Sequence, residues 1–313
     1  MNTTLLTAPI VGFVLAMAAT LFKVNLRMPE SLSPIVSTFL LLGIGLKGGR
    51  ELSEVSLDSF WKPLLAILLL GLLNPLVAFS LFRLTTRLDE SNSAALAAHY
   101  GSPSLVTFIV LLTTLDSRGI KYGGYAAALF ACLEIIVIIV ALSMSKKTSV
   151  NFCRKSLISE IVRGPSIALI LTGISIGAVV GNAGMTPTDS FFIDLVPGVL
   201  TLFLIEMGII AARNLKDFMS IGPRIIILAI AIPIINGLIG VLLAILGGMS
   251  QGDVIVLGTL AGSASFVAAP AVVRVALPEA SPGLYLTTSI GITFPLFITF
   301  GIPLLITVAS AVS

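Results

Sequence analysis

Long apolar runs separated by short polar segments make up most of the chain. A helix needs about 20 apolar residues to cross the hydrocarbon core of a bilayer, and the runs lack the two-residue alternation of barrel strands. We therefore predict an all-α integral membrane protein with ten transmembrane helices. The predicted helices are Leu5 to Phe22, Ser33 to Leu46, Lys62 to Phe82, Ser93 to Leu115, Tyr122 to Ser143, Gly164 to Gly181, Phe191 to Ala212, Pro223 to Leu246, Val254 to Val275 and Gly283 to Ala309.

Two of these helices, the fourth and the ninth, contain a polar break at mid-membrane. Gly101-Ser102-Pro103-Ser104-Leu105-Val106 interrupts the fourth helix, and Gly262-Ser263-Ala264-Ser265-Phe266-Val267 interrupts the ninth. A bilayer tolerates a broken helix only where the freed backbone groups line a cavity or are buried in protein. Matching breaks in the two halves of a membrane chain indicate a binding site between them, as in secondary transporters.

The chain is predicted to consist of two five-helix repeats, residues 1–145 and 164–313, joined by a linker at residues 146–163. Because five is odd, the second repeat is inverted in the membrane. Gly45-Leu46 parallels Gly208-Ile209, and both Asn74-Pro75 and the segment Pro233 to Asn236 put helix-bending residues midway along a third helix. Single matches also arise by chance, since small residues are common in transmembrane helices. The ordered series favours duplication.

Composition and charge support this topology. Hydrophobic residues make up 57% of the chain and charged residues only 11%, against about 25% charged in soluble domains. Most of the 18 Lys and Arg residues fall on one side of the predicted helices, which the positive-inside rule assigns to the cytoplasm. We expect a multi-pass protein of the bacterial inner membrane with a retained first helix, both termini outside and no nucleic-acid partner.

The linker is expected to be cytoplasmic and basic. Positive residues either hold this loop inside and attract anionic membrane lipid at roughly 1 kcal/mol per charge, or they bind a regulatory partner. The charged linker residues are Lys146, Lys147, Arg154, Lys155, Glu160 and Arg163.

The sequence gives little basis for a resident cofactor. Cys132 and Cys153 fit neither a disulfide framework nor a metal-ligand spacing. One histidine and no clustered carboxylates leave few ligands for a metal or redox group. We expect no cofactor, with Na⁺ acting only as a coupling ion.

The breaks favour a small oxyanion as the substrate. Each second half-helix, from Leu105 and from Phe266, is expected to begin with free N–H groups and a partial positive charge. Four serine hydroxyls can donate to an anion or coordinate a cation, and no Arg or Lys lies close in the sequence. The alternative is that Gly and Ser only permit close helix packing. The four serines are Ser102, Ser104, Ser263 and Ser265.

Several further polar residues within the predicted spans are candidates for ion binding. Thr107 and Thr259 flank the breaks and either reach Na⁺ or bond to their own helix backbone. Glu134 and Glu206 are candidate cation or proton sites, since ionisable groups in a membrane are costly. The structural alternatives are a hydrogen-bonded Glu134 facing a cavity and an ion pair of Glu206 with Arg213. Asp253, at a span end, is expected to be solvated.

An enzymatic alternative rests on His99, which precedes Ser102 by one helical turn and suggests a His-activated serine nucleophile. No carboxylate lies close in the sequence to orient the imidazole, there is no G-x-S-x-G segment, and Leu260 stands at the equivalent position of the second break. We interpret His99 as a packing or gating residue.

Three segments resemble motifs of the sodium-dependent bicarbonate transporters of cyanobacteria, and the likeness runs over nearly the whole chain, including a carboxylate corresponding to Glu134. The segments are Gly43-Ile44-Gly45-Leu46-Lys47-Gly48-Gly49, Gly101 to Thr107, and Gly262-Ser263-Ala264-Ser265 followed by Pro270 and Arg274.

The resemblance implies a gate and a core domain, a core site for bicarbonate and Na⁺, and control by a PII-like signalling protein. Ala264 and Phe266 depart from the family's second motif, and the linker is much shorter than the family's loop. The implied substrate site is Gly101, Ser102, Ser104, Gly262, Ser263 and Ser265. From the residues themselves, the candidate Na⁺ ligands are Ser104, Ser265, Thr107, Thr259 and Glu134.

We therefore predict a homo-oligomeric secondary transporter, not an enzyme, that imports a small anion with Na⁺, bicarbonate being the leading substrate. The alternatives are a Na⁺- or H⁺-coupled carrier of another organic anion, and an intramembrane serine hydrolase.

Overall fold

Helices account for all the regular structure in the described part of the chain. The computed structural model describes residues 7–26, 28–29, 31–145, 163–214 and 221–312. Residues 146–162, which carry most of the predicted linker and Cys153, lie outside the described residues. Within the described ranges, eight helical segments are long and apolar enough to cross a membrane, and α1 is a shorter apolar helix. The prediction of an all-α membrane protein is confirmed.

The helix bounds follow the predicted apolar runs closely. The helices are α1 (Ala8–Leu21), α2 (Leu32–Leu52), α3 (Leu57–Thr85), α4 (Glu90–Gly101), α5 (Leu105–Ser117), α6 (Ala126–Ser143), α8 (Pro165–Met185), α9 (Asp189–Phe192), α10 (Val196–Asn214), α11 (Pro223–Leu246), α12 (Gln251–Gly262), α13 (Ala269–Ala276), α14 (Pro282–Leu286), α15 (Phe294–Leu296) and α16 (Ile302–Val312), with a 3₁₀ turn at Thr186–Thr188 and π-helical turns at Thr287–Thr293 and Phe297–Gly301.

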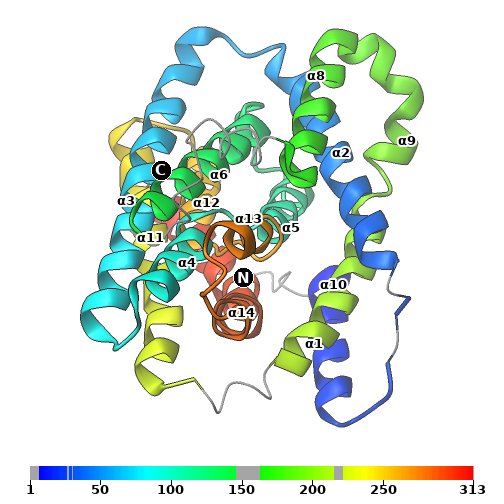
Figure 1. Ribbon diagram of the computed structural model, residues 1–313. Helices are drawn as coiled ribbons and strands as arrows, with labels where there is room; N and C mark the ends of the chain where they lie inside the picture. The colour runs from blue at the N-terminus through cyan, green and yellow to red at the C-terminus, as the bar shows by residue number, and fades with distance from the viewer. Residues whose placement is uncertain (1–6, 27, 30, 146–162, 215–220, 313) are drawn as a thin grey trace.

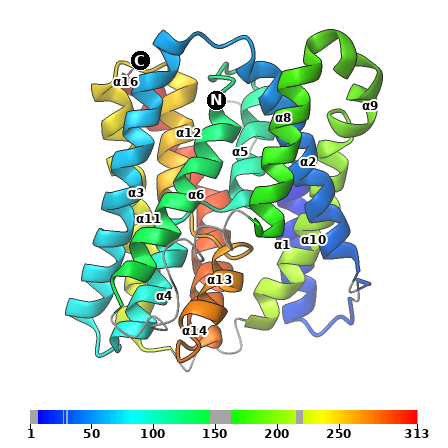
Figure 2. The same cartoon turned by 45° about the horizontal axis from the view of Figure 1, so that its top comes forward.

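Five helices stand together on one side of the molecule, α1, α2, α8, α9 and α10, and we name them the first helix group (Figures 1 and 2). Glycines bring α2 and α8 into close contact. A Cβ atom at Gly45 would lie 2.6 Å from the Ile170 carbonyl oxygen, and one at Gly173 would lie 2.8 Å from the Gly45 Cα. Gly49 and Gly177 repeat the spacing four residues on. Such small residues let membrane helices pack backbone to backbone.

The second helix group comprises α3 to α6 and α11 to α16, and it contains both breaks (Figure 2). Its centre is formed by α4 and α12, whose residues are almost all buried by the surrounding helices. Polar residues on these two helices are therefore shielded from lipid by protein, which is the condition for an interrupted helix at membrane depth.

Two sequence expectations about helix ends are wrong. α2 continues to Leu52 rather than ending at Leu46, because Lys47 and Arg50 form ion pairs there with Asp116 and Asp189. Asp253 is buried rather than solvated. Its carboxylate accepts hydrogen bonds from the Gly123 N–H at 2.8 Å and the Ser250 hydroxyl at 2.6 Å, because the segment before α6 folds over the start of α12.

Candidate functional site

The two breaks lie directly against each other in the centre of the second helix group. The backbone N–H of Ser265 donates to the carbonyl oxygens of His99, at 2.8 Å, and Ser102, at 3.1 Å. The backbone N–H of Ser104 donates to the Ser263 hydroxyl at 2.9 Å. The structure therefore brings together the segments 101–104 and 262–265 that the sequence singled out, although 161 positions separate them.

The Ser104 hydroxyl caps the start of α5, and the Ser265 hydroxyl bonds to the first residue of α13. The Ser104 oxygen accepts the Thr107 N–H at 3.3 Å, and the Ser265 oxygen accepts the Ala269 N–H at 3.4 Å. One N–H at each start, predicted to be free, is therefore paired with a serine hydroxyl. Both hydroxyls accept these bonds through oxygen, so each keeps its own proton to donate to a ligand.

The second half-helix of the second break begins later than predicted. α13 starts at Ala269 rather than Phe266 and has only 8 residues. The Ser265 N–H is bonded to the other break, and residues 266–268 form bends before the helix begins. Pro270 then lies in the first helical turn, where its missing N–H costs nothing.

The leading glycines of both breaks are packed against neighbouring helices. A Cβ atom at Gly101 would lie 3.0 Å from the Pro75 nitrogen, and one at Gly262 would lie 2.7 Å from the Pro233 carbonyl oxygen and from the Phe297 ring. Close packing thus accounts for glycine at these two positions, and the hydroxyls and N–H groups remain the groups able to contact a ligand.

Two asparagines that the sequence indicated only as helix-bending residues make hydrogen bonds at the breaks. The Asn74 side chain on α3 donates to the Ala261 carbonyl at the end of α12, at 3.3 Å. The Asn236 side chain on α11 donates to the Tyr100 carbonyl at the end of α4, at 3.1 Å. The signal in the sequence was an asparagine midway along the predicted third helix of each predicted repeat.

Two hydroxyls at the breaks are buried without a hydrogen-bond partner among the described residues, those of Ser102 and Thr259. For Thr259 this contradicts a bond to its own helix backbone, the alternative raised from the sequence. Thr107 is buried beside Ser104. An unpaired buried hydroxyl is costly, so these atoms are available to a ligand.

Both intramembrane glutamates are buried and leave one carboxyl oxygen unpaired within the described ranges. Glu134 lies on α6 one turn before Val137, whose side chain packs at Gly101. Glu206 accepts a hydrogen bond from the Ser33 hydroxyl. Arg213 instead donates to the Leu26 carbonyl at 3.5 Å, so the ion pair considered for Glu206 is not formed.

The His99 ring makes its contacts with residues other than Ser102. Its Nδ1 atom bonds to the Ala95 carbonyl at 2.7 Å, and the ring stacks on Tyr285 with centroids 4.3 Å apart. Neither the His99 Nε2 atom nor the Ser102 hydroxyl has a hydrogen-bond partner among the described residues. The imidazole–hydroxyl bond that a hydrolase requires is therefore not made.

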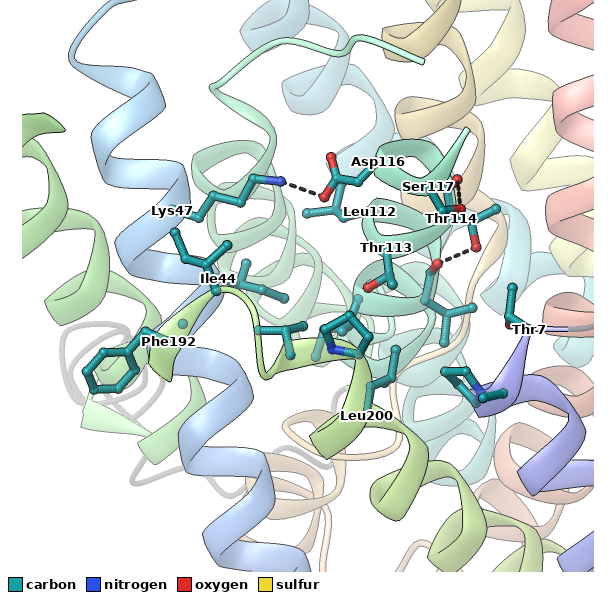
Figure 3. Close-up of a pocket in the computed structure, with 18 residues that line it drawn as sticks. Thr7, Ile44, Lys47, Leu112, Thr113, Thr114, Asp116, Ser117, Phe192 and Leu200 are labelled. Atoms are coloured by element: carbon teal, nitrogen blue, oxygen red, sulfur yellow. Dashed lines mark hydrogen bonds and ion pairs between the residues drawn. The ribbon is translucent and has the colours of Figure 1, made fainter. Parts of the chain in front are cut away.

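A cavity of about 420 Å³ opens between the two helix groups, with α2 and α10 on one side and α5 on the other (Figure 3). Lys47 reaches across it from α2 to Asp116 at the end of α5, with 2.6 Å between Nζ and Oδ2. The Tyr122 hydroxyl accepts from Lys47 and donates to Asp116. Burial and the nearby carboxylates raise the pKa of Tyr122, so its phenol stays protonated and keeps this bridge.

A second cavity, of about 370 Å³, also lies between the groups, lined by the beginnings of α2 and α8 and by α13. Ser33 lines the second cavity and Lys47 the first, and these residues lie about 21 Å apart along α2. The breaks fall between the cavities, because α5 leads from one break to the first cavity and residues 267 and 268 lead from the other break to the second.

A family model described as the Na⁺-dependent bicarbonate transporter superfamily matches residues 9–310, which is nearly the whole chain. No curated protein matches the sequence. The match includes both breaks, both asparagines and all the helices that form the two cavities. The chain therefore belongs to the Na⁺-dependent bicarbonate transporter superfamily.

Proposed function

We propose that this protein is a secondary active transporter that imports a small monovalent anion together with Na⁺, with bicarbonate as the favoured substrate. In this proposal the chain forms ten spans in a five-plus-five inverted repeat, with α4/α5 and α12/α13 each forming one broken span. The reciprocal bonds of Asn74 and Asn236 support the repeat, since each joins the third helix of one half to the break of the other.

One observation carries the proposed function: two serine-bearing breaks meet in a buried, formally neutral site. Hydroxyl protons and helix N-termini stabilise an oxyanion, while helix carbonyl ends and hydroxyl oxygens suit Na⁺. The anion-binding residues are proposed to be Gly101, Ser102, Ser104, Gly262, Ser263 and Ser265, and Na⁺ ligands come from Ser104, Ser265, Thr107, Thr259 and Glu134.

The two cavities support transport by alternating access. They lie toward opposite ends of α2 and both lie between the helix groups, so a shift of the second group against the first would open one cavity as it closes the other. With both termini outside the bacterial inner membrane, the first cavity faces outward. The same proposal includes assembly into a homo-oligomer and regulation by a PII-like protein.

Uptake into proteoliposomes tests the coupling ion. An inward Na⁺ gradient is expected to drive accumulation of labelled bicarbonate, and an imposed proton gradient without Na⁺ is expected to drive none. Transport that is independent of Na⁺ would contradict symport. Liposomes without protein provide the control for bicarbonate leakage as carbon dioxide.

Two observations favour a second candidate, a H⁺-coupled carrier of a larger organic anion. Glu134 and Glu206 are buried with unpaired carboxyl oxygens, as proton carriers in membranes often are. The first cavity also has room for an anion much larger than bicarbonate. Competition by a panel of organic anions, measured under each gradient separately, discriminates this candidate from a bicarbonate carrier.

The hydrolase alternative has its own test. Covalent labelling of Ser102 by a fluorophosphonate would support it, and absence of labelling in protein that still transports would remove it.

A further inference from the structure

Asn74 and Asn236 form a matched pair across the two breaks, and both are fully buried. The side-chain nitrogen of Asn74 donates to Ala261, and that of Asn236 donates to Tyr100. Each accepting carbonyl belongs to the last turn of a first half-helix, where the carbonyl has no partner further along its own helix.

These bonds fix how each amide is turned. A carbonyl oxygen can only accept a hydrogen bond, so the amide nitrogen must face it and the amide oxygen must point elsewhere. Neither Asn74 Oδ1 nor Asn236 Oδ1 has a hydrogen-bond donor among the described residues. Most buried polar atoms in native proteins are paired, so these two oxygens are candidates for contact with a ligand.

Both amides lie between the breaks rather than beside only one of them. Pro75, next to Asn74, packs on Gly101, while Asn74 itself bonds to Ala261. Gly237, next to Asn236, packs on Gly262, while Asn236 itself bonds to Tyr100. Each unpaired oxygen therefore belongs to the region where the two breaks meet.

The chemistry of this region selects the class of ligand. The unpaired atoms are amide and hydroxyl oxygens, and α4 and α12 both direct their partially negative carbonyl ends to it. The two amide oxygens can only accept a hydrogen bond, so they repel an anion and suit a hard cation, whereas the hydroxyls can face either. A divalent cation is disfavoured, because Ca²⁺ and Mg²⁺ sites draw on carboxylates, which the break segments lack.

We propose that Asn74 Oδ1 and Asn236 Oδ1 are Na⁺ ligands that join the two halves of the site. The assignment rests on the Na⁺ coupling proposed above and adds two residues that the sequence motifs do not contain. The asparagine nitrogen holds the opposite break in place while the oxygen of the same side chain binds the ion, so Na⁺ binding is tied to the contact between the halves.

Thermal unfolding of the purified full-length protein, without bicarbonate, tests this assignment separately from transport. Melting is measured against NaCl concentration, with choline chloride keeping the ionic strength constant. The wild-type protein is expected to be stabilised by Na⁺. In Asn74→Ala and Asn236→Ala, the Na⁺ concentration for half-maximal stabilisation is expected to rise at least tenfold.

Ser93→Ala is the matched control, because Ser93 is also buried with an unpaired oxygen but lies on α4 away from the breaks. It is expected to keep the wild-type Na⁺ response. If the alanine variants do not fold, Asn74→Ser and Asn236→Ser retain a small polar side chain and are expected to show the same loss of Na⁺ affinity.

The outcomes separate the two proposals. An unchanged Na⁺ response in folded Asn74 and Asn236 variants overturns the assignment and leaves Na⁺-coupled import standing. A wild-type protein that Na⁺ does not stabilise, and that also transports without Na⁺, overturns both.

Discussion

At the scale of single residues, the serine hydroxyls of the breaks combine two roles. Ser104 and Ser265 each accept a backbone N–H at the start of a half-helix, and each retains a proton. A side chain in this position both shapes the helix start and faces the region between the breaks. Its removal therefore affects stability and ligand binding together, and the two effects must be measured separately.

We predict that Ser104→Ala and Ser265→Ala each weaken binding of the anion or Na⁺ by about 1–2 kcal/mol, the scale of a hydrogen bond to a charged partner. Loss of the Ser104 cap also lowers stability by about 1 kcal/mol. Uptake at varied anion and Na⁺ concentrations measures the first effect, and thermal melting the second. Ser289→Ala is the control, because the Ser289 hydroxyl bonds to its own helix at Tyr285. Normal affinity for both ions in both variants would make these serines packing residues.

Gly262→Val is predicted to destabilise the folded protein by roughly 1–3 kcal/mol, the usual cost of overpacking. The new side chain would meet the Phe297 ring and the Pro233 carbonyl, and the carbonyl is backbone and cannot turn away. The expected readout is a lower melting temperature even without ligand. Gly198→Ala is the control, since a Cβ there would meet nothing within 4 Å. A normal melting temperature with lost transport would instead place the ligand against Gly262.

At the scale of elements, the ion pairs at the end of α2 differ in what they connect. Lys47 joins α2 to α5, in different helix groups, whereas Arg50 joins α2 to α9 within the first group. Only the Lys47–Asp116 pair must break if the groups shift relative to each other. It also closes one side of the first cavity (Figure 3).

Breaking this pair is predicted to favour the state with the groups apart by up to about 1 kcal/mol, since a partly exposed ion pair contributes no more. Lys47→Met and Asp116→Asn should each change the transport rate up to about fivefold, and the exchange Lys47→Asp with Asp116→Lys should restore part of it. Arg50→Met and Asp189→Asn are the matched controls and should leave the rate unchanged. Equal effects from both pairs would show that neither acts as a link between the groups.

The helices were largely predictable because the length of an apolar run is set by the thickness of the bilayer. The breaks were predictable because Gly, Ser and Pro stand out in an apolar sequence. The pairing of Lys47 with Asp116, the burial of Asp253 and the late start of α13 were not, since each depends on an element distant in the sequence. Asn74 and Asn236 were visible as a repeated feature, but their bonds to the opposite breaks required the structure.

At the scale of the whole molecule, the two cavities give a prediction about access. Thr113 lines the first cavity and Ser37 lines the second. Thr113→Cys and Ser37→Cys therefore place one thiol in each cavity. In a background with Cys132→Ser and Cys153→Ser, an impermeant thiol reagent is expected to label the two positions from opposite sides of the membrane. Na⁺ and bicarbonate together should raise labelling at one position and lower it at the other. Labelling of both from the same side would contradict alternating access between these cavities.

The crossed hydrogen bonds of Asn74 and Asn236 also affect the insertion and assembly of the protein in the membrane. Asn236 follows Tyr100 by 136 residues, so α4 is synthesised long before its partner exists. In a bilayer the unpaired Tyr100 carbonyl is costly, and the first half therefore stays incompletely assembled until α11 has been inserted. A chain that stops after α6 should be degraded, whereas two separately expressed halves should stabilise each other, because the partners they lack are supplied by the other half.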